Sequence, residues 1–204
     1  VFKGAGVALI TPFKNGKVDW ETFEKLIDFQ IENNTDALII CGTTGESSTL
    51  TDEEHRQVLK FALEVVKGRV PMIAGTGSND VAYAIDLTRY ACEIGYDAML
   101  VVTPYYNKTT QKGLVTMFTA IADASTKPLI LYNVPSRTGV NIEPATYAAL
   151  AEHPMIQGIK EANGQIDKIT ETMALCGDKL DLYSGNDDQI VPLMSVGGKG
   201  VISV

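Results

Sequence analysis

The chain has 204 residues, of which 45% are hydrophobic and 21% charged, and it carries a net charge of −8. This balance is typical of a globular protein, the negative charge argues against a nucleic-acid partner, and no apolar run approaches the ~18 residues of a membrane span. Three cysteines lie far apart in the sequence, which favours reduced thiols in the cytoplasm over a disulfide framework or a metal site.

Apolar runs with strand character alternate with amphipathic helical segments along the whole chain. Asp19, Thr51 and the proline at position 144 supply helix-start signals. In chain order, the expected elements are strand 7–10, helix 20–31, strand 37–41, helix 51–68, strand 70–74, helix 80–94, strand 98–102, helix 112–124, strand 129–132, a helix from about 143, strand 155–161, helix 165–175, strand 180–183, helix 188–196 and strand 200–204.

Eight strands alternating with seven helices predict parallel strand pairing, and eight such units favour a closed (β/α)8 TIM barrel. A doubly wound open sheet is the alternative, but it would carry a glycine-rich loop after the first strand, where Thr11-Pro12-Phe13 stands instead. We expect residues 1–204 to be a catalytic barrel domain that is incomplete at its C-terminal end, because the chain stops in strand eight, without an eighth helix.

Lys160 lies at the end of the run 155–161, and alternation predicts that Ile156, Gly158 and Lys160 share one face of that strand. If this face points into the barrel, burial lowers the pKa of the lysine, and a neutral amine can form a Schiff base with a carbonyl. The alternative for Lys160 taken alone is a surface lysine at a strand end.

Barrel enzymes place their chemistry at the C-terminal ends of the strands. There, alternation places Thr43 on the face of Ile39 and Cys41, and Tyr132 on the face of Ile130. Thr43, Tyr132 and Lys160 should therefore converge, and the two hydroxyls could relay protons to and from a lysine adduct.

Each of these hydroxyl residues also has a purely structural interpretation: Thr43 could be a turn residue, and Tyr132 could be an aromatic residue of the core. Arg137 follows strand five and could bind a carboxylate in bidentate fashion, although a structural ion pair is an equal alternative. Asp187 and Asp188 could suggest a metal, but the first turn of a helix explains them more simply, and we expect no metal site.

Four segments, in order, resemble the dihydrodipicolinate synthase family of pyruvate-dependent class I aldolases, a group that includes N-acetylneuraminate lyase. The resemblance covers the whole chain. The segments are Gly42-Thr43-Thr44-Gly45-Glu46, Tyr105-Tyr106-Asn107, Tyr132-Asn133-Val134-Pro135-Ser136-Arg137-Thr138-Gly139 and Gly158-Ile159-Lys160-Glu161.

This resemblance implies that Lys160 forms an imine with pyruvate, with Tyr132 as the proton donor and acceptor beside it. Thr43 matches the relay residue, and Tyr106 the tyrosine inserted into a neighbouring subunit's site. Thr44 resembles the residue that holds the pyruvate carboxylate.

Arg137 resembles the residue that receives the carboxylate of the second substrate, aspartate semialdehyde, and Gly185 and Ile202 match main-chain positions near the lysine. The family is cytoplasmic, needs no organic cofactor and is usually a homotetramer, a dimer of dimers. A helical domain follows its barrel.

The paired threonines at 43 and 44 and the arginine at 137 favour the synthase over sialic acid lyases, which typically carry Ser-Thr at the first site and no such arginine. A lyase or a keto sugar-acid aldolase is the alternative within the group. A non-catalytic barrel that binds a keto acid is the alternative outside it, and such a binder has no need of a buried amine.

One position departs from lysine-inhibited members of the family. Their interface pocket uses residues that match Ser47, His55, Asn79 and Tyr106 together with a Glu at position 83, where this chain has Tyr83. Because that carboxylate would pair with an amino group of the inhibitor, we expect weak or absent feedback by lysine.

Overall fold

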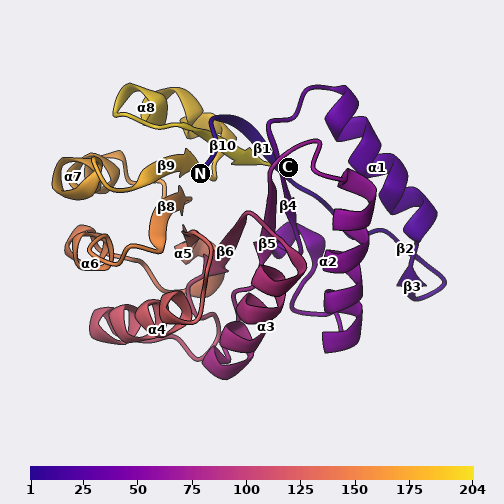
Figure 1. Cartoon of the computed structure of the whole chain (residues 1–204). Coiled ribbons are helices and arrows are strands. Elements are labelled where there is room, and N and C mark those ends of the chain that lie inside the picture. The colour runs from indigo at the N-terminus through magenta and orange to yellow at the C-terminus, as the bar shows by residue number, and fades with distance from the viewer.

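The computed structural model describes residues 1–204 and contains a closed barrel of eight parallel strands ringed by helices (Figure 1). Neighbouring strands follow the order β1-β10-β9-β8-β7-β6-β5-β4, and every barrel pairing is parallel. The expected (β/α)8 architecture is therefore confirmed. The barrel strands are β1 (Gly4–Ala8), β4 (Ala37–Ile40), β5 (Met72–Gly75), β6 (Ala98–Val102), β7 (Leu129–Asn133), β8 (Ile156–Glu161), β9 (Asp181–Ser184) and β10 (Gly200–Ser203).

The helices lie outside the strands, as the amphipathic pattern requires. Their starts follow the sequence signals: Asp19 accepts a hydrogen bond from the Thr22 amide at 3.1 Å, and Thr51 and Glu54 form a capping box. The α-helices are α1 (Trp20–Glu32), α2 (Asp52–Val66), α3 (Val81–Ile94), α4 (Gln111–Asp123), α5 (Pro135–Thr138), α6 (Pro144–Leu150), α7 (Ile166–Cys176) and α8 (Ile190–Ser195), and the 3₁₀ turns are η1 (Thr43–Gly45) and η2 (Asp187–Gln189).

Three local features differ from the sequence expectation. A small hairpin, β2 (Phe13–Lys14) with β3 (Lys17–Val18), turns through Asn15 and Gly16, both at positive φ, and its two-residue strands are too short to show an apolar pattern. The short helix α5 was not among the elements expected from the sequence. The first strand begins at Gly4 rather than Val7, because its small residues hide the apolar alternation.

Side chains from alternate strand positions form two separate cores. Ile39, Ile130 and Tyr132 belong to a cluster of 13 buried residues inside the barrel, while their neighbours along the strands, such as Leu38 and Leu131, belong to a cluster of 38 between barrel and helices. The expected inward face of β7 is therefore confirmed.

Two residues expected on the inner faces lie in the outer core instead. Cys41 follows β4 with a left-handed φ of 56°, so the alternation ends before it. Ile156 is also outside, because a register shift opposite Leu129 and Ile130 places one extra residue in β8. The alternation holds from Gly158 to Lys160, which is the part that positions the amine.

Candidate active site

Lys160 is placed at the mouth of the barrel by β8, where it pairs in register with Tyr132 on β7 and Tyr183 on β9. Its side chain is only 6% exposed. Gly185 makes room for it, because a Cβ there would lie 3.2 Å from Cε of Lys160. At Gly158, on the same strand as Lys160, a Cβ would instead lie 3.2 Å from the Ile130 side chain. Any larger residue at 185 would therefore crowd the amine.

The environment of Lys160 favours the neutral amine. Burial, and secondarily the positive charge of Arg137, lower the pKa of Lys160 to about 8. Its Nζ lies 4.3 Å from the centroid of the Tyr132 ring, and it forms no ion pair with a carboxylate. A lysine held in this way is suited to nucleophilic attack on a carbonyl.

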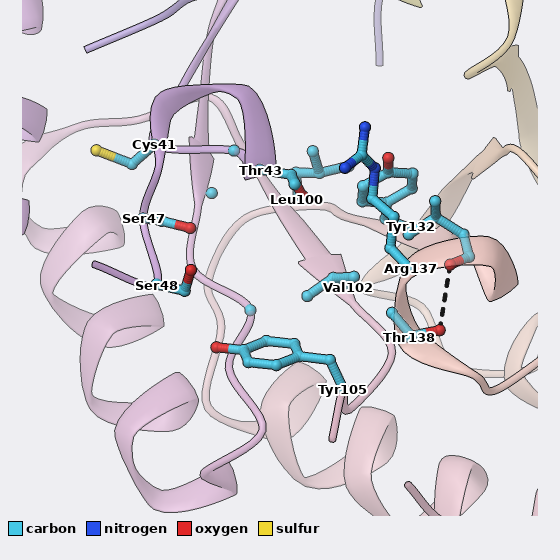
Figure 2. A pocket seen from close by; sticks show the side chains of 14 residues that line it. Cys41, Thr43, Ser47, Ser48, Leu100, Val102, Tyr105, Tyr132, Arg137 and Thr138 are labelled. Carbon is cyan, nitrogen blue, oxygen red and sulfur yellow. Dashed lines mark hydrogen bonds between the residues drawn. The ribbon is translucent and has the colours of Figure 1, made fainter. Parts of the chain in front are cut away.

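Tyr132 ends the inner face of β7 and is 7% exposed. Burial raises the pKa of its hydroxyl, while the positive charge of Arg137 and the polar side chain of Thr43 act in the opposite direction. In Figure 2, the side chains of Thr43, Tyr132 and Arg137 gather on one side of the cavity. The phenol thus remains protonated near neutral pH and lies beside the amine, where it can donate a proton.

Thr43 and Thr44 stand in the 3₁₀ turn η1, directly after β4. Gly42 precedes the turn and Glu46 ends it in the left-handed conformation, so the chain folds back at the strand end. Both threonines line one cavity with Lys160. Thr43 also lines a second, adjoining cavity, and the sulfur of Cys41 points away from that cavity, as Figure 2 shows.

Arg137 is presented by α5, which begins with Pro135 at its first turn and ends at Gly139 with φ of 69°. Thr138 fixes this short helix, because its hydroxyl bonds to the Val134 carbonyl at 3.2 Å and to the Thr103 hydroxyl at 3.1 Å. Arg137 lines two adjoining cavities. It is therefore a cation placed at their boundary.

The two cavities share Thr43, Tyr132, Val134 and Arg137 as their common wall. The first, which we name the Lys160 cavity, contains seven of the eight expected site residues: Thr43, Thr44, Tyr132, Arg137, Lys160, Gly185 and Ile202. The second, which we name the Tyr105 cavity, extends toward Ser47, Ser48 and Tyr105 (Figure 2). One barrel mouth thus holds two adjoining cavities that meet at Tyr132 and Arg137.

Tyr106 is the expected site residue that this chain does not bring into the cavity. It is 91% exposed and its backbone is left-handed, with φ of 71°. It lines neither of the two cavities. The sequence expectation for Tyr106 places it in a neighbouring subunit, which a single chain does not test.

Asp187 and Asp188 were assigned from sequence to the first turn of a helix, and η2 does contain them. The structure also places both in the wall of the Lys160 cavity, and the Ser203 hydroxyl donates to Asp187 at 2.6 Å. Sequence reasoning missed this position. Their place just after the strand-end residue Gly185 was the available signal.

The comparisons with known proteins agree with this geometry. The model of the dihydrodipicolinate synthetase family matches residues 1–204. Over this whole chain, the 4-hydroxy-tetrahydrodipicolinate synthase of Trichlorobacter lovleyi is 59% identical and that of Clostridium novyi 54% identical, with 70% and 69% of their own lengths covered.

Solved structures of the same kind superpose closely. A dihydrodipicolinate synthase from Aquifex aeolicus has a TM-score of 0.97 at 48% identity, with all of this chain and 70% of that one covered. A chloride-inhibited dihydrodipicolinate synthase from Acinetobacter baumannii, complexed with pyruvate, has the same TM-score, identity and coverage. With the family model matched from end to end, the chain belongs to the dihydrodipicolinate synthetase family.

Proposed function

We propose that this barrel condenses pyruvate with L-aspartate 4-semialdehyde to give 4-hydroxy-tetrahydrodipicolinate, a step of lysine and diaminopimelate biosynthesis. The observation that carries the proposal is a buried amine at Lys160 that has no ion-pair partner, lies over the Tyr132 ring and shares a cavity with Arg137. These are the groups that a Schiff-base aldolase with two anionic substrates needs.

In the first step, the neutral amine of Lys160 attacks the ketone carbon of pyruvate to give a carbinolamine. Tyr132 donates a proton to the oxygen that leaves as water, and the imine remains. Thr43 is placed to return protons to Tyr132, because the two side chains line the same cavity walls. Thr44, in the same turn, is positioned for the pyruvate carboxylate.

In the second step, loss of a methyl proton converts the imine into an enamine, whose carbon attacks the aldehyde carbon of the semialdehyde. Arg137 holds the carboxylate of this second substrate. The substrate's amino group then attacks the imine carbon, which closes the ring and releases Lys160 as a free amine. Gly185 and Ile202 shape the wall beside the lysine.

The test is to incubate the enzyme with pyruvate, reduce with borohydride and locate the modified peptide by mass spectrometry. A stable adduct on Lys160 supports the proposal, and no adduct in excess pyruvate refutes it. Turnover with aspartate semialdehyde, but not with N-acetylmannosamine, then separates the synthase from a sialic acid lyase.

We further propose that residues 1–204 act as the catalytic domain and that the enzyme assembles as a homotetramer in the cytoplasm. The exposure of Tyr106 supports self-association, since a second copy would cover an aromatic ring that is 91% exposed. Three free cysteines support a reducing compartment. None of the helices combines the length and apolar character needed to cross a membrane.

Regulation by lysine should be weak. His55 is buried, its Nε2 lies 3.0 Å from the Gly75 carbonyl oxygen, and its ring centroid lies 6.5 Å from that of Tyr83 in an edge-on arrangement. Tyr83 thus places a neutral ring where lysine-inhibited members of the family carry a carboxylate. This supports the expectation of little feedback, which an inhibition assay with L-lysine tests.

A further inference from the structure

Directly behind the Lys160–Tyr132 pair lies a second cross-strand pair, Glu161 and Asn133. The register pairs Tyr132 with Lys160 and Asn133 with Glu161, so the first pair faces the barrel interior and the second faces the surrounding helices. The preceding outward residues, Leu131 and Ile159, are apolar members of the outer core. A polar pair in this layer is therefore an exception.

Glu161 is 3% exposed, and each of its carboxylate oxygens accepts from two donors. Oε1 accepts from Nδ2 of Asn133 at 3.0 Å and from the amide of Asn163 at 2.9 Å. Oε2 accepts from the same Nδ2 at 3.2 Å and from the Tyr147 hydroxyl at 2.8 Å. Every partner is a donor, so no oxygen is left to water or to an unpaired contact.

The same two residues also join three strand ends through their main chains. The carbonyl of Asn133 accepts from the amide of Ala162 at 2.9 Å, and the carbonyl of Glu161 accepts from the amide of Gly185 at 2.8 Å. The ends of β7, β8 and β9 are thus fixed to one another at the level of the amine. Gly185, beside Lys160, is one of the residues held.

An apolar pair could fill this layer without the cost of burying a carboxylate. An apolar pair would, however, fix the relative position of the two strand ends less closely, because hydrogen bonds are directional and apolar contacts are not. A displacement of the reacting groups by about 1 Å can cost on the order of 100-fold in rate. The position of this pair, one residue beyond both reacting side chains, is where such control is most direct.

We propose that Glu161 is a positioning residue for the Schiff-base reaction, which acts through Asn133 to hold Lys160 against Tyr132. It touches neither substrate. This inference rests on the proposed function, because it assigns Glu161 a role in forming the Lys160 adduct. It extends that function to a residue outside both cavities.

The test compares Glu161→Gln and Asn133→Ala with Glu143→Gln as the matched control. Glutamine keeps the size of glutamate but turns an amide nitrogen toward two donors, whichever way it is oriented. Asn133→Ala removes the cross-strand donor while Tyr147 and Asn163 still serve the carboxylate. Glu143 accepts from Nδ2 of Asn141 at 3.1 Å, in the same network, but does not bridge β7 and β8.

Three quantities are measured for each variant: the single-turnover rate of adduct formation with pyruvate, the split between kcat and KM, and the melting temperature. We expect Glu161→Gln and Asn133→Ala to slow adduct formation and kcat by about 10- to 100-fold with KM for pyruvate within about threefold, and Glu143→Gln to stay within about twofold of wild type. If Glu161→Gln does not fold, the positioning role is judged from Asn133→Ala alone.

A lower melting temperature with an unchanged rate of adduct formation would overturn the positioning role and leave Glu161 as a structural residue. Wild-type enzyme is tested first. If it forms no adduct on Lys160, the proposed function itself fails and the positioning role fails with it. A normal wild-type adduct with normal rates in both variants refutes the positioning role alone.

Discussion

The rate at which Lys160 reacts with pyruvate should rise with pH up to about 8 and then level off, because burial and Arg137 lower the pKa of this amine to about 8. At pH 7, an amine of that pKa is about 10% neutral, whereas a lysine with the ordinary pKa near 10.4 is about 0.04% neutral. Burial therefore raises the reactive fraction on the order of 200-fold.

The assay mixes enzyme with pyruvate between pH 6 and pH 10, quenches with borohydride at short times and quantifies the Lys160 adduct by mass spectrometry. Arg137→Met should move the midpoint to higher pH, because it removes the second cause of the lowered pKa. Arg69→Met is the matched control, since Arg69 pairs with Asp28 at 2.7 Å, away from the cavity. A wild-type midpoint at pH 10 or above, or a downward shift in Arg137→Met, would refute the reasoning.

Lys160→Met should abolish the adduct and yet raise the melting temperature at pH 7. The pKa of Lys160 is lower in the folded than in the unfolded state, so the destabilisation caused by burying its charge is fully present below pH 8 and fades as pH rises toward 10.5. An unchanged or lower melting temperature of Lys160→Met at pH 7 would contradict this. Tyr132→Phe should lower kcat by about 10²- to 10⁴-fold without unfolding the barrel, and near-normal kcat would remove the phenol from the proton path. Tyr106→Ala should weaken self-association and lower activity, since a second copy would cover a ring that is 91% exposed in the single chain; equal activity would exclude Tyr106 from a shared site. Tyr83→Glu should strengthen inhibition by L-lysine about 10- to 100-fold over wild type, as one charged hydrogen bond is worth about 1.5–3 kcal/mol, and micromolar inhibition of the wild type would contradict the weak feedback expected here.

The barrel was predictable from sequence because its signals are local. Apolar runs of strand length, helix caps such as Thr51 and the regular alternation of the two element types each depend on residues close together in the chain. The signals failed where side chains were small or the backbone irregular. The strand at Gly4–Ala8 shows little apolar alternation, and the two strands of the hairpin around Asn15-Gly16 are too short to show one.

Part of the site was equally accessible, because strand ends are local features and alternation fixes which side chains share a face. Tyr132 and Lys160 were placed inward on that basis, and the register confirms that they are paired neighbours. Alternation gave the wrong face for Cys41 and Ile156, since a left-handed residue and a register shift each break the period of two.

The sequence by itself determined the barrel class and the group of strand ends from which a site could be built. Only the tertiary structure decided how far the amine is buried and that Arg137 lies close enough to lower its pKa. It also decided that Asp187 lines the cavity and that Glu161 and Asn133 bond behind the reacting pair. Burial, charge proximity and cross-strand contacts depend on residues distant in the chain, and these become neighbours only when the barrel closes.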